Sequence, residues 1–248
     1  MDLANKIASG EDVDVYKDGT NAIKIFKDPQ AKMKTLYEAL THSRVETTGL
    51  SMPIIHEVTV IDGKWAIIMD HIEGKTLYQI MKEDPDNLAN YLADMVDIQI
   101  QIHAKSMPLL NKLKDKLSRQ IEALDALDDT KKYELLTRLE SMPKHKKLCH
   151  GNFTPMNIIV NNDKTFIVDW VAARQGNASA DVARTYLMLS LDFPEAAELY
   201  LDLFCKKSGT AKKYVQAWLP IVAAAQLTIN RPEEKDLLQR WIDVVDYE

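Results

Sequence analysis

The first 70 residues carry short runs of apolar residues separated by polar turn residues. Residues 13–16 and 22–26 flank Asp18-Gly19, a dipeptide that favours the tight turn of a β-hairpin. Residues 53–60 and 64–69 form a second pair of apolar runs, joined by a turn at 61–63. The pattern therefore predicts two pairs of antiparallel strands.

A helix is predicted between these two strand pairs. Residues 31–48 contain few β-branched residues, and Met33, Leu36 and Leu40 recur at helical spacing. Gly49 follows directly, and glycine commonly ends helices. The expected order in this part of the chain is strand, strand, helix, strand, strand.

Beyond Gly74 the pattern becomes helical. Amphipathic segments without a strand signal cover 88–105, 109–127 and 131–141, and helices are expected again from about residue 180 onward. One exception is a predicted hairpin, with strands at 158–160 and 166–168 and a polar turn at 161–164. We therefore expect an α+β chain, with a small antiparallel β-rich lobe containing one helix over residues 1–72 and a larger, mainly helical lobe over residues 73–248.

Composition narrows the class of protein. The chain has 248 residues, of which 46% are hydrophobic and 27% charged, with a formal net charge of -6, as is typical of soluble globular proteins. Lys and Arg are scattered rather than gathered into the basic stripe that phosphate neutralisation requires, so no nucleic-acid partner is expected.

The cysteine count and the apolar stretches bear on location. Two cysteines are too few for a disulfide scaffold of this size, which favours a reducing cytoplasm. No signal peptide is recognised, and the longest apolar stretch, 217–229, contains Pro220 and falls short of the roughly 18 residues of a membrane span. We expect a cytoplasmic protein without a membrane partner.

The predicted hairpin at 158–168 brings two oxygen-bearing side chains to its open end. If Ile158 pairs with Val168, Asn157 lies beside Asp169, because the open ends of a hairpin lie together. A carboxylate and an amide oxygen, with room for water and phosphate oxygens, suit Mg²⁺. The alternative is a hairpin with polar ends that bind nothing.

The loop before this hairpin carries a resemblance to a known family. Residues 150–157 read His-Gly-Asn-Phe-Thr-Pro-Met-Asn, and Asp169-Trp170 follows the hairpin. This resembles the catalytic loop of the aminoglycoside phosphotransferase and choline kinase group, which has His-Gly-Asp, four residues, Asn, and then a hairpin ending in Asp-Trp. The resemblance implies a bilobal, protein-kinase-like fold with nucleotide between the lobes. It also implies that Asn157 and Asp169 bind Mg²⁺ and that Asp181 is structural.

Asn152 departs from the family pattern. It stands where the family has its catalytic Asp, which accepts the proton of the substrate hydroxyl. An Asn side chain accepts a hydrogen bond and orients a hydroxyl but takes no proton. General-base catalysis contributes about 10²- to 10⁴-fold, yet phosphoryl transfer depends mostly on positioning and charge neutralisation. An enzyme with Asn here is expected to be slow without being inactive.

Two residues of the first lobe match the same family. Lys24 resembles the strand lysine that pairs with nucleotide phosphates, and Glu38 lies where the family's lysine-anchoring Glu falls. Glu38 comes eleven residues before Gly49, which is similar to the family's spacing before its Gly-Leu-x-x-Pro segment. Taken singly, the two would be interpreted as a surface lysine and a solvated glutamate.

Residues 67–74 resemble the strand and hinge that carry the adenine. The resemblance implies that Met69 lines the back of the pocket, while the Asp70 carbonyl and the Ile72 amide meet the base edge. Ser9-Gly10 lies where the phosphate-covering loop is expected, although the chain contains no Gly-x-Gly. The resemblance covers about residues 7–190.

Other candidate chemistry is weaker. Cys149 could be a nucleophile beside His150, but strand neighbours point to opposite faces, and Cys149 is expected to be a small buried residue. The histidines show no zinc spacing, and His103 is expected to pack on its helix. Acidic residues between 83 and 97 could attract a cationic acceptor or form a solvated face.

The leading expectation is a phosphotransferase that uses ATP or GTP with Mg²⁺ and acts on a hydroxyl of a small molecule. The connection after Asp169 is short and lacks the long activation segment of protein kinases, so a small acceptor fits better than a peptide. The alternative, motivated by Asn152, is a degenerate kinase-like protein that binds nucleotide without phosphoryl transfer. The sequence leaves the acceptor and the oligomeric state open.

Overall fold

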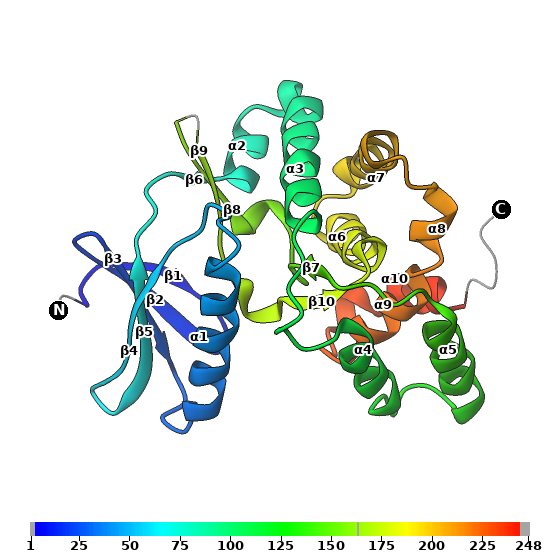
Figure 1. The fold of residues 1–248 in the computed structure, drawn as a ribbon, viewed down its shortest axis with the longest axis horizontal. Coiled ribbons are helices and arrows are strands. Elements are labelled where there is room, and N and C mark those ends of the chain that lie inside the picture. Colours follow the sequence, from blue (N-terminus) through cyan, green and yellow to red (C-terminus); the bar gives the residue numbers. More distant parts are fainter. Residues whose placement is uncertain (1–2, 163, 244–248) are drawn as a thin grey trace. The chain divides into compact units, whose positions relative to one another are not determined.

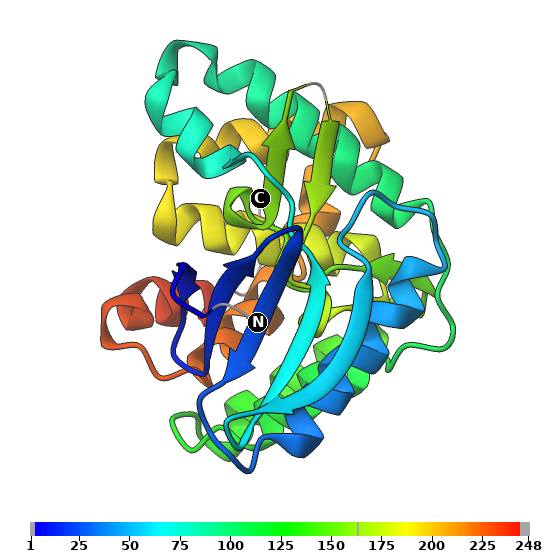
Figure 2. The same cartoon turned by 90° about the vertical axis from the view of Figure 1, so that its left-hand side faces the viewer.

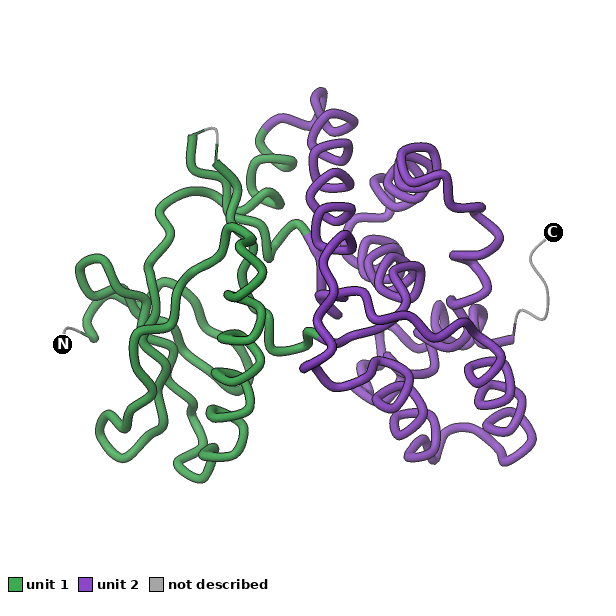
Figure 3. Tube along the Cα trace, in the orientation of Figure 1, with its two compact units in different colours: residues 1–83, 155–173 green, residues 84–154, 174–248 purple. Residues whose placement is uncertain are grey.

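A computed structural model describes residues 3–162 and 164–243, and the chain forms two compact units (Figures 1 and 3). Unit 1 comprises residues 1–83 and 155–173, and unit 2 comprises residues 84–154 and 174–248. Each unit is therefore built from two separate stretches of chain.

Unit 1 is organised around an antiparallel five-stranded sheet in the order β1-β2-β3-β5-β4. The strands are β1 (Lys6–Ser9), β2 (Val13–Asp18), β3 (Asn21–Phe26), β4 (Ile55–Ile61) and β5 (Lys64–Asp70). Helix α1 (Lys32–Glu46) lies along one face of this sheet (Figure 2). The two predicted strand pairs and the helix between them are confirmed.

Successive side chains of β3 point to opposite faces of the sheet, and the two faces pack against different residues. Ile23 and Ile25 pack with Ala66 of β5 on one face. Phe26 packs with Ala39 of α1 on the other. Since side chains alternate along a strand, position 24 belongs to the face that α1 covers.

The apolar residues whose spacing indicated α1 do not face the core. Met33, Leu36 and Leu40 are 84%, 45% and 49% exposed, so their spacing marked the helix but not its buried side. The buried side of α1 carries Ala39 and Val45 together with four polar residues: Thr35, Glu38, Thr41 and His42. These positions can be buried because partners satisfy them: the Thr35 hydroxyl donates to the Ala31 carbonyl, and a His42 ring nitrogen lies 2.7 Å from the Pro53 carbonyl.

Strand β1 was not expected from the sequence. All four of its residues are exposed, so it has no buried face to produce an alternating pattern. Pairing with β2, not burial of its side chains, holds it in the sheet.

The rest of unit 1 is a three-stranded sheet in the order β6-β8-β9 with short helices. Its elements are β6 (Lys75–Thr76), α2 (Leu77–Glu83), η2 (Pro155–Asn157), β8 (Ile158–Asn161), β9 (Lys164–Ile167) and η3 (Trp170–Ala172). The predicted hairpin is present, but Ile158 pairs with Ile167 and not with Val168, so the expected register is wrong by one residue. Asp163, which belongs to the turn predicted at 161–164, lies outside the described residues.

Unit 2 is mainly helical, as expected. Its helices are α3 (Leu88–His103), α4 (Leu113–Glu122), α5 (Asp129–Ser141), α6 (Ala178–Asp192), α7 (Pro194–Ser208), α8 (Lys212–Gln216), α9 (Leu219–Leu227) and α10 (Lys235–Ile242), with short turns η1 (Pro85–Asn87) and η4 (Pro232–Glu234). Two short strands, β7 (Lys147–Cys149) and β10 (Arg174–Gly176), pair antiparallel, and β10 was not predicted from the sequence. None of the helices in the described part of the chain is long and apolar enough to cross a membrane.

The two compact units differ in their residue ranges from the two lobes expected at residues 1–72 and 73–248. Residues 73–83 and 155–173 belong to unit 1 because β6 pairs with β8 and the Ile167 amide donates to the Ser51 carbonyl at 2.9 Å. Hydrogen bonds between distant stretches of sequence produce this grouping. The division after residue 72 stays a prediction.

Gly74 permits the close approach of the chain to β8. Its φ is +139°, and a Cβ atom there would lie 2.3 Å from the Val160 carbonyl oxygen. We expect Gly74→Ala to destabilise the protein by about 1–3 kcal/mol through overpacking, measured as a lower urea midpoint. Gly10→Ala is the control, since the nearest atom to its Cβ would be 3.8 Å away. Equal midpoints for the two variants would contradict the expectation.

Candidate functional site

Lys24 is a nearly buried cation on β3. Its side chain is 14% exposed and lies on the sheet face covered by α1, between residues that contribute to the core. Nζ is 2.5 Å from Oε1 of Glu38, whose side chain is 9% exposed. The structure thus brings together the two first-lobe residues that the sequence paired.

Asp169 completes a charged cluster with this pair. Its Oδ1 lies 3.4 Å from Lys24 Nζ, and its side chain is 33% exposed. Burial alone lowers the pKa of Lys24, but the carboxylates of Glu38 and Asp169 outweigh it and raise that pKa above its ordinary value. Lys24 is therefore a fixed positive charge at neutral pH.

Asp169 adopts a backbone conformation that is uncommon for a residue other than glycine. Its φ and ψ are 63° and 57°, at the start of η3. The next residue, Trp170, is fully buried, and its indole nitrogen donates to the Ile167 carbonyl at 3.1 Å. Because Trp170 anchors the turn, Asp169 is held in this conformation, which is frequent at functional sites.

Asn157 lies beside Asp169 despite the register error. The Val168 amide donates to the Asn157 carbonyl at 3.0 Å, so Asn157 is opposite Val168 and one residue from Asp169. Oxygen donors of this kind fit Mg²⁺, which binds through one or two carboxylates together with waters and substrate phosphates. Within the described residues, no group of three histidine, cysteine, aspartate or glutamate side chains could hold a metal ion, so a protein-only cage is not available there.

The predicted hinge residues follow the end of β5. Met69 is half-buried and packs against the core beneath α1. The Asp70 carboxylate accepts a hydrogen bond from the Ile54 amide at 2.9 Å and lies 2.8 Å from a His56 ring nitrogen. Ile72 lies past the end of the strand. The Asp70 side chain therefore ties the end of β5 to the start of β4 and to the residue before it.

Ser9 and Gly10 lie at the turn between β1 and β2. The Ser9 hydroxyl donates to Asp14 at 2.7 Å, and the Gly10 amide donates to the Val13 carbonyl at 2.8 Å. These two contacts close the turn. The expected phosphate-covering segment is thus a hairpin turn rather than an open loop.

In unit 2, the loop that contains Asn152 is held by a buried carboxylate. Asp181, on α6, accepts hydrogen bonds from the His150 and Gly151 amides at 3.1 and 2.7 Å. Its Oδ2 also lies 2.9 Å from a His103 ring nitrogen. The Asn152 amide in turn donates to a His150 ring nitrogen at 3.3 Å. Asn152 is half-buried.

The charge of Asp181 is stabilised by these donors. Burial raises the pKa of its carboxyl, but the hydrogen bond and charge of His103 and the Gly151 amide outweigh burial, and the pKa lies below its ordinary value. His103 was expected only to pack on its helix, and the sequence contains no signal that places it against residue 181, because 78 positions separate them. Cys149 is fully buried, as expected, and burial raises the pKa of its thiol.

Comparisons with known proteins agree with this architecture. The family model described as the phosphotransferase enzyme family, APH, matches residues 4–218. A search of curated protein sequences found no match.

Three solved structures illustrate the likeness of the fold. The chain matches a ternary complex of a thermostable mutant of aminoglycoside phosphotransferase APH(4)-Ia with ADP and hygromycin B, with a TM-score of 0.71, 13% identity and coverage of 96% of this chain and 91% of that one. It matches a choline/ethanolamine kinase family protein from Mesorhizobium loti with a TM-score of 0.64 and 14% identity, over 96% of this chain and 87% of that one. It matches the streptomycin-ATP-APH(2")-IIa ternary complex with a TM-score of 0.61 and 17% identity, over 97% of this chain and 90% of that one. The expected kinase-like α+β fold is confirmed.

We expect Asp181→Asn to destabilise the protein by about 1.5–3 kcal/mol at pH 7, because an amide replaces a buried, hydrogen-bonded charge. The folded-state pKa lies below the unfolded one, so this contribution is present above about pH 4 and is lost as the pH falls through the folded value. Urea denaturation from pH 7 to pH 3 should show the difference from wild type shrinking. Asp202→Asn, at an exposed ion pair with Lys212, is the control. A constant difference across the range would refute this account.

Proposed function

The chain belongs to the phosphotransferase enzyme family, and from this premise we propose that it transfers the γ-phosphoryl group of ATP or GTP to a hydroxyl of a small molecule. The observation that carries the proposal is the cluster of Lys24, Glu38 and Asp169 in unit 1. A buried cation with an anchoring carboxylate, and a second carboxylate 3.4 Å away, is the arrangement with which protein kinases bind a metal–nucleotide complex.

Lys24 supplies the positive charge for the nucleotide phosphates. Glu38 holds its ammonium in place before the nucleotide arrives, so little reorganisation is needed at the moment of transfer. Asn157 and Asp169 would hold Mg²⁺. When bound, this ion neutralises negative charge on the phosphate oxygens.

The remaining nucleotide contacts follow from the family resemblance. Met69 would line the base pocket, and the Asp70 carbonyl and the Ile72 amide would meet the base edge. Ser9 and Gly10 would cover the phosphates from the β1–β2 turn. That turn is closed by its own hydrogen bonds, which favours a preformed cover.

Asn152 would orient the acceptor hydroxyl. Its side chain has no basic group, so the hydroxyl proton leaves to water or to the transferred phosphoryl group. Since positioning and charge neutralisation dominate phosphoryl transfer, this arrangement supports slow turnover.

A small acceptor agrees with the short connection after Asp169. This connection holds only η3 and β10 before α6 begins at Ala178. Peptide docking in protein kinases uses a long activation segment at this place.

Both cysteines are free thiols, in agreement with the cytoplasm as the expected compartment.

Asn152 also favours a second candidate function. A kinase-like protein that binds nucleotide without transfer would keep the Lys24 cluster and lose the proton acceptor. The two candidates share nucleotide binding and differ only in turnover.

We expect Lys24→Met to weaken MgATP binding about ten- to hundredfold, because a charge-assisted contact to phosphate contributes about 1.5–3 kcal/mol. Titration calorimetry measures the change. Lys64→Met, which removes a charge from an exposed position at the start of β5, should bind as wild type does. If wild type gives no heat with MgATP or MgGTP, the proposed function is wrong.

We expect the natural protein to transfer the phosphoryl group slowly. Asn152→Asp should raise the rate of transfer about 10²- to 10⁴-fold, because it restores a proton acceptor. ATP turnover is measured across a panel of hydroxylated small molecules, and Asp169→Ala should abolish it in both backgrounds. Turnover in Asn152→Asp together with none in the natural protein would establish the binding-only alternative. Turnover that survives Asp169→Ala would contradict the assigned metal site.

A further inference from the structure

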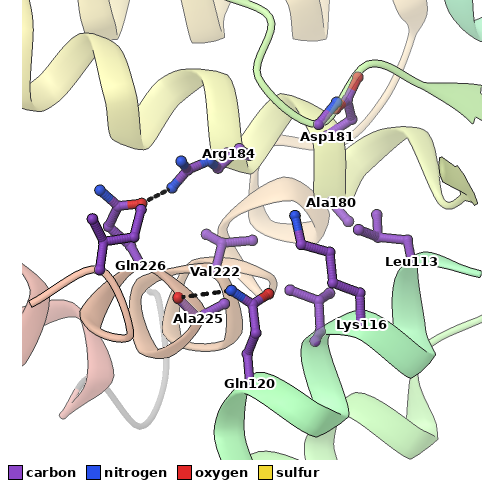
Figure 4. Close-up of a pocket in the computed structure, with 12 residues that line it drawn as sticks. Leu113, Lys116, Gln120, Ala180, Asp181, Arg184, Val222, Ala225 and Gln226 are labelled. Atoms are coloured by element: carbon purple, nitrogen blue, oxygen red, sulfur yellow. Dashed lines mark hydrogen bonds between the residues drawn. The ribbon is translucent and has the colours of Figure 1, made fainter. Parts of the chain in front are cut away.

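Unit 2 contains a cavity of about 90 Å³ between α4, α6 and α9 (Figure 4). This space is large enough for a carboxylate or a phosphate group of a ligand. Apolar side chains such as Leu113 and Val222 form part of its wall. We call it the unit 2 cavity.

Two cations line the unit 2 cavity. Lys116 projects from α4, and Arg184 from α6. The Lys116 ammonium makes no hydrogen bond or ion pair with any residue in 3–162 or 164–243, and Arg184 donates to the neutral amide of Gln226. Burial, and then the charges of Arg174 and Arg184, lower the pKa of Lys116 to about 8. Burial lowers the pKa of Arg184 to about 10.

The nearby carboxylates are already engaged. Asp181 is bound by the His150 and Gly151 amides and by His103. Glu234 accepts hydrogen bonds from Gln226 at 2.5 Å and from Arg231 at 3.1 Å. Neither carboxylate forms an ion pair with Lys116 or Arg184 in the described residues. Asp181, which itself lines the cavity, attracts both cations, and Glu234 and Asp192 attract Arg184. Since neither cation has a direct ion-pair partner among the described residues, each is available to bind an anion.

The cavity adjoins the loop that carries Asn152. Gly151, the preceding residue, contributes to its wall. A ligand group bound in the cavity would thus hold the rest of the molecule next to this loop.

We propose that the unit 2 cavity binds an anionic group of the acceptor, a carboxylate or a phosphate, through Lys116 and Arg184. The acceptor is then a hydroxylated anion. An amine would meet repulsion from both cations, while an anion would relieve their mutual repulsion. This assignment rests on the proposed function for the identity of the ligand as acceptor, but binding to the cavity can be measured without it.

The test is an NMR titration in the absence of nucleotide with four matched probes: glycerate, glycerol phosphate, glycerol and aminopropanediol. We expect binding of one or both anions, and the two anionic probes distinguish carboxylate from phosphate. Lys116→Met should weaken this binding at least tenfold. Arg119→Met removes a charge from an exposed position on the same helix and should not change it. Lys24→Met should also leave it unchanged, which separates the cavity from the nucleotide phosphates.

A pH series gives a readout that loss of structure would not imitate. Anion affinity should fall as the pH rises through about 8, because Lys116 loses its proton, and Lys116→Arg should keep binding and remove this fall. The charged groups facing Lys116 from neighbouring elements are Arg174, Arg184 and Asp181, and none is expected to titrate between pH 7 and 9.

The outcomes separate this inference from the proposed function. Preference for the amine, or equal anion affinity in wild type and Lys116→Met, overturns the inference, even where MgATP binds. Anion binding that depends on Lys116 supports the cavity assignment, and a parallel failure of MgATP to bind would then overturn the proposed function alone.

Discussion

The charged cluster of unit 1 depends on a buried ammonium that must be compensated. Lys24 lies on the covered face of the sheet, where an unpaired charge would be costly, and Glu38 and Asp169 both lie within ion-pair distance of it. Glu38 comes from α1, and Asp169 from the segment after β9. One cation thus joins three elements, of which the segment after β9 is far from the other two in sequence, and the burial of Glu38 on α1 follows from this requirement.

Unit 2 contains buried charges of two kinds, one with direct partners and one without. Asp181 is satisfied by donors from the Asn152 loop and from α3, and it therefore acts as a structural support. Lys116 and Arg184 have no carboxylate partner of this kind among the residues described. Charges satisfied by direct hydrogen bonds hold the protein together, whereas cations without a direct ion-pair partner next to a cavity are available to a ligand.

The spacing of apolar residues along the sequence predicted where helices and strands occur better than it predicted which of their sides are buried. The helix at α1 was found from its spacing and from Gly49, yet its apolar stripe of Met33, Leu36 and Leu40 is exposed. Burial is decided by what lies opposite a helix, and opposite α1 lie Lys24 and the Pro53 carbonyl. Likewise, a one-residue shift in the β8–β9 register left Asn157 next to Asp169, because both residues lie at the same open end.

The sequence by itself determined the two strand pairs of unit 1 with α1 between them, the β8–β9 hairpin, the family, and the pairing of Lys24 with Glu38, since these are encoded in periodicity and in motifs with fixed spacing. Only the tertiary structure decided that His103 supports Asp181 and that Lys116 and Arg184 line one cavity. On its own helix, Lys116 is indistinguishable from a solvated lysine. Its burial and its lowered pKa arise from helices that the chain brings together over long separations, and no local pattern encodes such contacts.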